Sequence, residues 1–422
     1  MYLLISGHYI SSLLFTLGIL GIFIIGGQSV LTGFIQNDPF SRTASYALTT
    51  VPLYILMAQF IMQAGIVRDL YNLMYKFSRG KSGPLGVMTI FLGGLLGGVS
   101  GSGAATSAAL GQIAVPELRR RGYPDELAGA IAASAGSLSA IIPPSVLLIL
   151  YGVIAQISIG KLFTGAIIPG IILMITFAIV AMVYLRFTKD KMEVVEEDDD
   201  LDDAPVSRYI TVVLIGLLIV VSIFGGIYFG IFTPTEAGAV GAFEALIMAL
   251  LLKKVNFNFM KTALMETIKI SVMAMFIVMG ASLFGRFISL SLMPRKIIAL
   301  LEPLLEMPNL VIIIIMVFYF FLFMFIEGVA VILMTVPVIT PILDVIHVDP
   351  LWFGILLTVV CTIGMITPPV GLCIFAVGGA TGIPIERLFK VGTIFGVVAT
   401  IVLVSLLILF PEVVLWLPSQ MR

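Results

Sequence analysis

The chain has 422 residues, of which 60% are apolar and 11% are charged, and its formal net charge is −1. Its mean hydropathy is +1.16, far above that of a water-soluble globular domain, and apolar runs of about 18 or more residues recur along it. These values exclude a soluble enzyme and a nucleic-acid-binding module. They predict an all-α polytopic membrane protein surrounded by the lipid bilayer.

Charged breaks separate the apolar stretches. The first stretch is too long for the core of a signal peptide and follows no basic region, so we expect a retained membrane helix. Residues 253–269 and 294–308 are shorter and amphipathic, which predicts connecting helices along the two membrane surfaces. The apolar stretches are 9–35, 45–66, 84–118, 125–157, 162–186, 209–231, 237–252, 270–293, 309–346, 351–377 and 388–410.

The basic residues predict an orientation. Of the 23 Lys and Arg residues, 17 fall in five loops and four fall in the loops on the opposite side. Because cytoplasmic loops carry the excess of basic residues, the richer set is placed in the cytoplasm. The loops of this set are 67–83, 119–124, 186–208, 253–269 and 378–390.

Two apolar stretches must then return to the side from which they enter. Residues 84–118 lie between cytoplasmic loops and carry Ser-Gly-Ser-Gly at 100–103, whereas residues 309–346 lie between outer loops and carry Glu-Gly at 327–328. Five crossings separate the two stretches. This odd number predicts two inverted-topology repeats, each with a re-entrant hairpin. Non-helical backbone at membrane depth is tolerated only inside protein or beside a cavity, so both tips should face an interior site.

The two hairpins align without a gap at an offset of 225 residues, which places Gly103 on Gly328 and Pro143-Pro144 on Pro368-Pro369. The same offset places Pro116 on Pro341 and Gly129 on Gly354. Each repeat therefore contains a hairpin followed by a helix that a Pro-Pro pair breaks. Paired interruptions in corresponding halves of a membrane chain point to the substrate and ion site of a transporter.

The breaks and the tips offer complementary ligands. A proline inside a helix lacks the N–H that would bond the carbonyl four residues earlier, so the breaks free the carbonyls of Ser139, Ala140, Gly364 and Met365 for a small cation. Helices that begin at the tips present unpaired N–H groups to an anion. Together they describe a sodium-coupled carrier of an organic anion. The competing interpretation is that Gly and Ser allow close helix packing and Pro kinks a helix, which the matched inverted pair disfavours.

The chain resembles the large membrane subunit of TRAP transporters from about residue 45 onward. The resemblance is carried by Ser-Gly-Ser-Gly-Ala-Ala-Thr at 100–106, Ile-Ile-Pro-Pro-Ser at 141–145, Tyr-Gly at 151–152, Ser-Ile-Gly-Lys-Leu-Phe at 158–163, Thr-Pro-Thr-Glu-Ala at 233–237 and the stretch from Gly354 to Thr-Pro-Pro-Val-Gly at 367–371. It implies tripartite, ATP-independent, Na+-driven uptake of an organic acid (a C4-dicarboxylate, sialic acid or related carboxylate) across the inner membrane of a prokaryote.

The resemblance also implies partners and an architecture. A periplasmic substrate-binding protein would deliver the substrate, and a small four-helix membrane subunit, expected as a separate polypeptide, would complete the complex. An elevator-type transport domain would move against a fixed scaffold. The predicted divisions are scaffold helices in 1–66, the first repeat in 67–186 with its hairpin in 84–118 and broken helix in 125–157, an acidic cytoplasmic linker in 187–208, scaffold and connecting helices in 209–293, the second repeat in 294–411 with its hairpin in 309–346 and broken helix in 351–377, and a C-terminal tail in 412–422.

The breaks, the tips and the resemblance together predict two overlapping sets of site residues. The expected substrate-binding residues are Ser100, Ser102, Gly103, Thr106, Ser145, Glu327, Gly328 and Thr367. The expected sodium ligands are Ser100, Gly101, Ser102, Gly136, Ser139, Ala140, Gly328, Gly364, Met365 and Thr367.

Ionisable residues within apolar segments are functional candidates by default. Glu327, at a tip, is the strongest, with contact to an ion or substrate set against a structural hydrogen-bonding role. Arg286 is alone in its helix and could pair with a carboxylate, but it is rather expected to snorkel or to contact the small subunit. Glu244 is expected to reach the interface, and Glu236 to stabilise the first turn of a helix.

Two alternatives differ in class. Gly-Val-Ser-Gly at 98–101 matches an intramembrane serine protease, but a serine nucleophile needs a base, and the only histidines are His8 and His347. No His-Glu-x-x-His zinc motif is present, so we do not expect an enzyme. A conventional secondary transporter or a channel for organic anions, without a binding protein, remains the second interpretation, and a requirement for a sodium gradient would separate carrier from channel.

Overall fold

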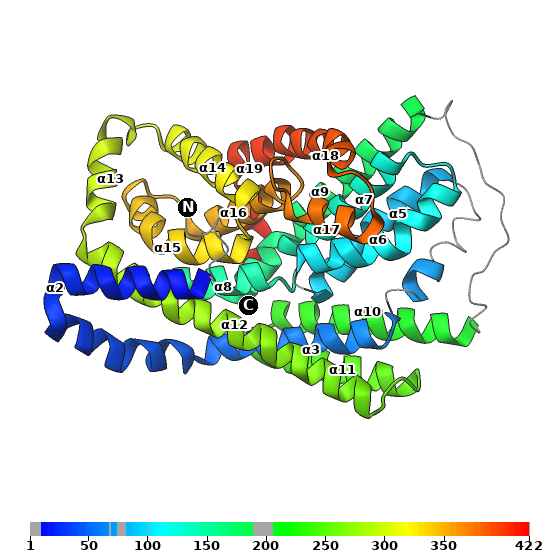
Figure 1. Cartoon of the computed structure of the whole chain (residues 1–422), viewed down its shortest axis with the longest axis horizontal. Coiled ribbons are helices and arrows are strands. Elements are labelled where there is room, and N and C mark those ends of the chain that lie inside the picture. Colours follow the sequence, from blue (N-terminus) through cyan, green and yellow to red (C-terminus); the bar gives the residue numbers. More distant parts are fainter. Residues whose placement is uncertain (1–9, 67–68, 74–81, 101, 189–205, 422) are drawn as a thin grey trace.

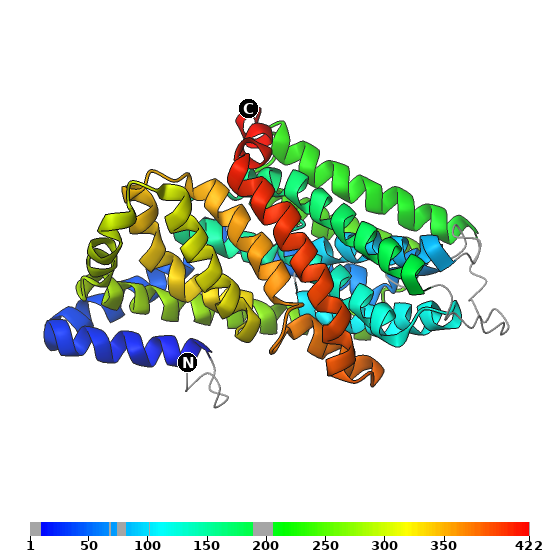
Figure 2. The ribbon, with the colours of Figure 1, turned by 90° about the horizontal axis from the view of Figure 1, so that it is seen from above.

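The computed structural model describes residues 10–66, 69–73, 82–100, 102–188 and 206–421. Within these ranges every regular element is a helix, and nine helical segments are long and apolar enough to cross a membrane. The expected all-α polytopic architecture is therefore confirmed for the described residues. Figures 1 and 2 show most of the long helices running along the longest axis of the molecule.

One layer consists of five long helices that lie side by side along one edge in Figure 1. Glycines let them approach closely: a Cβ added at Gly18 would lie 2.8 Å from the backbone nitrogen of Phe284, and one at Gly241 would lie 2.7 Å from Met57 Sδ. Thr50 and Thr235 share a buried hydroxyl–hydroxyl hydrogen bond of 2.7 Å in this layer. The helices are α2 (Ile10–Thr43), α3 (Thr50–Gln63), α10 (Val206–Tyr228), α11 (Pro234–Leu251) and α12 (Phe257–Leu290).

The expected N-terminal membrane helix is present, but it is broken. Gly27 has φ 72° inside α2, a left-handed conformation that glycine adopts without a steric penalty. Figure 1 shows the chain reversing its direction at the left end of the long axis, where α2 is labelled. The apolar stretch therefore forms two helical halves, and the first of them packs on α12 through Gly18.

The connecting helix expected at 253–269 is not a separate element. The side chain of Asn256 accepts a hydrogen bond of 2.8 Å from the Phe259 N–H, and α12 then continues without interruption for 34 residues. Neither proline nor glycine occurs between Phe257 and Met279 to end it. The connection expected at 294–308 does contain a separate short helix, α13 (Met293–Leu301).

The first repeat has the predicted hairpin and broken helix. Helices α5 (Ser82–Ser100) and α6 (Gly103–Arg120) form the hairpin. Helix α7 (Asp125–Ser137) continues into a 3₁₀ turn, η2 (Leu138–Ala140), and the chain resumes as α8 (Val146–Ala155) after the Pro-Pro pair. At the base of the hairpin the Gly86 N–H donates to the Tyr123 hydroxyl at 3.1 Å, and burial raises the pKa of Tyr123 to about 12.

The second repeat follows the same plan. Its hairpin is α14 (Pro308–Phe325) and α15 (Gly328–Val345), joined by a hydrogen bond of 2.6 Å from the Tyr319 hydroxyl to Thr335 Oγ1. Its broken helix is α16 (Pro350–Gly364) and α17 (Leu372–Thr381). Adding 225 to the bounds of α6 gives the bounds of α15, and adding 225 to the start of α7 gives the start of α16. The offset found in the sequence is thus also the offset of the folded elements.

The two repeats interlock crosswise. In both views the α5–α6 hairpin enters from one end of the long axis and the α14–α15 hairpin enters from the other, as inverted repeats require. A Cβ added at Gly111 of α6 would lie 3.3 Å from Thr381 of α17. One added at Gly328 of α15 would lie 3.2 Å from Leu147 of α8. The second arm of each hairpin therefore packs against the half-helix that follows the break of the other repeat.

A further helix follows each repeat. Helix α9 (Ile159–Thr188) follows the first repeat, and α18 (Ile385–Ala399) follows the second. The predicted C-terminal tail contains a helix, α20 (Glu412–Ser419), whose Pro418 and Val414 lie 3.3 Å from a Cβ added at Gly165 of α9.

Candidate functional site

The two hairpin tips place equivalent residues at the starts of equivalent helices. Ser102 is the N-cap of α6, and its Oγ accepts a hydrogen bond of 3.4 Å from the Ala105 N–H. Glu327, 225 positions later, is the N-cap of α15, and its Oε2 accepts a hydrogen bond of 3.4 Å from the Ala330 N–H. Both caps are exposed. Each tip therefore presents a capped helix N-terminus, where the peptide dipoles favour negative charge.

The first helical residue of each tip is a buried glycine without room for a side chain. A Cβ added at Gly103 would overlap the Met365 methyl group and lie 3.1 Å from Cys373 Sγ. One added at Gly328 would lie 2.5 Å from Cys361 Sγ. The α6 tip thus contacts Met365 and α17, and the α15 tip contacts α16 one turn before Met365, so both tips pack on the second broken helix.

The two cysteines are site residues that sequence reasoning missed. Both thiols are buried and unpaired, and each packs against the glycine that begins a hairpin helix. Their spacing from the second Pro-Pro pair could have indicated this, because Cys361 lies one turn before Met365 and Cys373 lies in the first turn of the half-helix after the break.

The first break uses the hydroxyl of Ser145 locally. Ser145 is the N-cap of α8: its Oγ–H donates to the Ala140 carbonyl at 2.7 Å, and its Oγ accepts from the Leu148 N–H at 3.4 Å. The prediction that the proline leaves the Ala140 carbonyl free is therefore wrong as stated. The carbonyl keeps one lone pair for a ligand, since a carbonyl oxygen has two.

Ser139 is the residue of this break with unused hydrogen-bonding capacity. Its side chain is 1% exposed, and its Oγ has no hydrogen-bond partner. It lies 3.3 Å from the position of a Cβ on Gly103, at the start of α6. A buried hydroxyl without a partner costs free energy, and a bound cation or a polar ligand group would remove that cost.

The second break also satisfies the carbonyls expected to be free. The Gly364 carbonyl accepts from the Thr367 N–H at 3.2 Å, and the Met365 carbonyl accepts from the Cys373 N–H at 3.0 Å. The side chain of Thr367 donates to the Ile363 carbonyl at 2.7 Å and lies 2.9 Å from a Cβ added at Gly396 of α18. Its hydroxyl therefore bonds within the break and lies against α18, and the site role expected for Thr367 stays a prediction.

The remaining predicted residues occupy three different settings. Thr106 is buried, and its Oγ1–H donates to the Ser102 carbonyl at 3.0 Å, so it stabilises the first turn of α6. Gly136 of α7 faces α6, where a Cβ would overlap Ser107. Gly101 and the side chain of Ser100 lie outside the described residues.

The ionisable residues away from the tips have structural partners. Glu236 forms a capping box with Thr233, as expected for a first-turn acid, and Glu244 accepts a hydrogen bond of 2.8 Å from the Ser222 hydroxyl. Arg286 lies 5.2 Å from the ring centroid of Phe34. Glu327 is thus the acid that the fold places at a tip.

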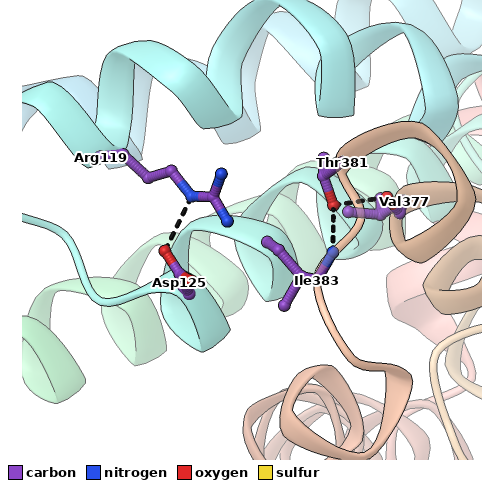
Figure 3. A network of polar contacts seen from close by, with 5 residues as sticks. All are labelled: Arg119, Asp125, Val377, Thr381 and Ile383. Carbon is purple, nitrogen blue, oxygen red and sulfur yellow. Dashed lines mark hydrogen bonds and ion pairs between the residues drawn. The ribbon is translucent and has the colours of Figure 1, made fainter.

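Polar contacts also fix the ends of α6 and α17 that the basic loops place in the cytoplasm. Figure 3 shows Arg119 and Asp125 joining the end of α6 to the start of α7, with 2.7 Å between Nε and Oδ1. The same view shows Thr381 ending α17: its hydroxyl donates to the Val377 carbonyl at 2.7 Å and accepts from the Ile383 N–H at 3.3 Å. Gly382, with φ 71°, then turns the chain.

The arrangement can bind opposite charges close together. Helices α6 and α15 begin beside the break regions, so N–H groups suited to an anion lie next to carbonyl oxygens and the Ser139 hydroxyl, which suit a cation. The structure brings Gly103, Ser139 and Met365 together, with Ser102 next to Gly103 in the chain. Gly328 lies against Cys361, one helical turn before Met365.

Comparison with known proteins gives this geometry a context. Residues 1–413 match the family model described as the tripartite ATP-independent periplasmic transporter, DctM component. The C4-dicarboxylate TRAP transporter large permease protein DctM of Pseudomonas aeruginosa is 30% identical over 90% of this chain and 86% of that protein. The sialic acid large permease protein SiaM of Vibrio cholerae is 28% identical over 94% and 92%.

Two further matches are a longer relative and a solved structure of low sequence identity. The isethionate TRAP transporter permease protein DctMQ of Oleidesulfovibrio alaskensis is 30% identical over 87% of this chain but only 58% of that protein. The crystal structure of the Alcanivorax borkumensis YdaH transporter has a TM-score of 0.79 over 97% of this chain and all of that one, at 12% identity, and it supports the fold alone. Because the family model matches residues 1–413 and a relative is 30% identical over most of both chains, this chain belongs to the DctM family, the large permease subunits of TRAP transporters.

Proposed function

We propose that the chain carries an organic acid across the inner membrane of a prokaryote together with sodium ions. The expected substrate is a small carboxylate, because relatives are named for C4-dicarboxylates and for sialic acid. The observation that carries the proposal is the meeting of two capped hairpin tips with two Pro-Pro breaks in one region of the fold.

The two tips differ in charge, which assigns them different tasks. The cap of α6 is the neutral Ser102, so its helix N-terminus can accept the carboxylate of a substrate. The cap of α15 is Glu327, whose own carboxylate occupies that helix end and would repel a second anion. Substrate is therefore expected at the α6 tip, and Glu327 is expected to favour sodium nearby.

The oxygen atoms expected to bind sodium are of two kinds, backbone carbonyls and one side-chain hydroxyl. The carbonyls of Ala140, Gly364 and Met365 each accept one hydrogen bond, which leaves one lone pair on each oxygen for an ion. Ser139 adds a buried hydroxyl oxygen without a partner. Oxygen ligands of this kind suit a hard cation, and coupling follows because the ion offsets the charge of the nearby carboxylate.

An elevator movement suits the contacts between the long-helix layer and the repeats. The Tyr54 ring of α3 meets the Phe163 ring of α9 edge-on, with centroids 5.7 Å apart. A Cβ added at Gly285 of α12 would lie 3.4 Å from Pro337 of α15. Ring and van der Waals contacts lack strong directionality, so two bodies joined by them can slide at lower cost than bodies joined by hydrogen bonds.

We expect two protein partners. The family description is that of a tripartite periplasmic transporter, which calls for a periplasmic binding protein and a small membrane subunit besides this chain. The relative named DctMQ is longer than this chain, in keeping with a second membrane part joined to the first. A conventional transporter or channel that works without partners is the second candidate.

Sodium binding can be tested on the purified chain by thermal unfolding. Because a ligand that binds only the folded state stabilises it, Tm should rise saturably in NaCl but not in choline chloride at equal ionic strength. Ser139→Ala should weaken this rise. Ser134→Ala is the matched control, since Ser134 is also fully buried in the same repeat with an unpartnered hydroxyl. Equal Tm values in the two salts, or equal effects of the two variants, would contradict the sodium site.

A further inference from the structure

A cavity of about 450 Å³ lies beside the first Pro-Pro break, and no residue of either hairpin tip belongs to its described lining. Five parts of the chain enclose it: α3, α5, the break itself, α9 and α10. Its walls include Met57, Phe91, Pro144, Ala166 and Ile223. It therefore lies between the long-helix layer and the first repeat, where Tyr54 also meets Phe163.

The side chains that line the cavity favour an apolar ligand. Every side chain that lines the cavity is apolar, apart from a glycine, so water would find none of the two to four polar partners that a buried water needs. The wall residues Leu95, Ile171 and Val220 are 50%, 46% and 40% exposed, and two of them belong to helices long enough to span a membrane. The cavity is thus continuous with the apolar surface that faces the hydrocarbon of the bilayer.

The second repeat contains a related groove of about 340 Å³, in which Met316 and Phe320 stand 225 positions after Phe91 and Leu95. There the described lining comes from α14, α16 and the helix after α18. In the first repeat α10 additionally covers the groove with Ile219, Val220, Ile223 and Phe224. A hydrocarbon chain in the groove of the second repeat would contact three helices, whereas one in the groove of the first repeat would also be covered by α10.

We propose that the covered groove of the first repeat is a binding site for one acyl chain of a membrane phospholipid. A free fatty acid fits less well, because no cationic or hydrogen-bonding side chain lines the cavity to receive its carboxylate. A phospholipid keeps its head group outside the mouth and inserts only its tail. The inserted tail contacts α3 and α10 on one side and α5, α9 and Pro144 on the other, so it lies between the two bodies of the proposed elevator. This binding does not depend on sodium coupling.

The test uses the unmodified chain in vesicles that contain a small fraction of phosphatidylcholine with a photoreactive diazirine in mid-chain. After irradiation, peptide mass mapping locates the cross-links. We expect them on Met174 of α9 and Phe224 of α10, which line the cavity and are only half-buried. Met334, also half-buried but in α15 outside the cavity lining, is the matched control and should stay unlabelled. Labelling restricted to outward-facing positions such as Leu217 would overturn the proposal.

A cavity-filling variant separates bound lipid from surrounding lipid. Ala166→Phe should abolish the labelling of Met174 and Phe224 while Leu217 stays labelled, and unchanged labelling of Met174 would overturn the proposal. If Ala166→Phe does not fold, Ile167→Phe at the less buried neighbouring position makes the same test. A photoreactive fatty acid that labels Met174 better than the phospholipid would contradict the choice of ligand.

Discussion

Gly103 and Gly328 begin equivalent helices at the two tips, and at both positions a single added methyl group would collide with a neighbouring side chain. The sequence could predict these positions, because the offset of 225 superposes them. It could not predict the neighbours. The partners Met365, Cys361 and Cys373 reach the tips only through the crosswise packing of the two repeats, which is a tertiary property without a local pattern.

Replacing Gly328 by Ala should destabilise the chain, because the new Cβ would lie 2.5 Å from Cys361 Sγ. Overpacking of this kind costs about 2 kcal/mol. Cys361→Ala in the same chain should recover most of that loss, since it removes the sulfur. The measurement is thermal unfolding of the single and double variants. Gly379→Ala, at a position with open space around the added Cβ, is the control and should not destabilise. A double variant no more stable than Gly328→Ala would contradict this packing.

At the scale of elements, the sequence predicted both hairpins and both broken helices within a few residues. The pattern is strong there, because glycine and proline interrupt long apolar runs and act locally. It failed where the outcome depends on hydrogen bonds made after folding. Ser145 reaches back to the Ala140 carbonyl, and the Cys373 N–H reaches the Met365 carbonyl across the break. A missing proline N–H therefore does not leave a carbonyl without a partner. The continuous α12 was missed because amphipathicity alone does not fix where a helix ends. The break at Gly27 does have a local signal, the Gly-Gly pair at 26–27, which sequence reasoning missed.

Changing Pro143-Pro144 or Pro368-Pro369 to Ala-Ala should weaken sodium dependence while preserving stability. The change restores two N–H donors, lets a regular helix form and withdraws carbonyls from the site, whereas an interior proline costs a helix about 3 kcal/mol. Sodium half-saturation of transport, measured beside Tm, should rise in both double variants. If proline served only to kink the helix, the variants would misfold or repack with an unshifted half-saturation.

The link between α10 and the helical segment after α3 is an ion pair that can be tested separately. Arg208 donates to Asp69 Oδ2 through two nitrogens, at 2.9 and 2.8 Å, and the Asp69 side chain is 7% exposed. Asp69→Asn should lower the free energy of unfolding by about 2 kcal/mol, because it leaves a half-buried guanidinium unpaired. Glu266→Gln breaks the exposed pair with Lys269 and should cost less than about 0.5 kcal/mol. Denaturant unfolding of both variants checks this; equal losses would contradict the structural role.

At the scale of the whole molecule, the two hairpins enter from opposite ends of the long axis, in agreement with the count of crossings made from the charges. The orientation of these ends in the membrane remains a prediction from the basic loops. Single cysteines at His347 and at Arg120, in a background where Cys361 and Cys373 are replaced, can be probed with an impermeant thiol reagent. We expect His347 to label from outside and Arg120 only from inside. Labelling of both from one side would contradict the inverted repeats.

The central claim is sodium-coupled uptake by a tripartite transporter, and vesicle transport tests it most directly. The chain is reconstituted with its small membrane subunit, and uptake of the binding protein's labelled ligand is measured under an inward sodium gradient. We expect uptake only when the gradient, the small subunit and the binding protein are all present, and little or none with this chain alone. Equal uptake after potassium replaces sodium, or robust uptake by the lone chain, would contradict the account.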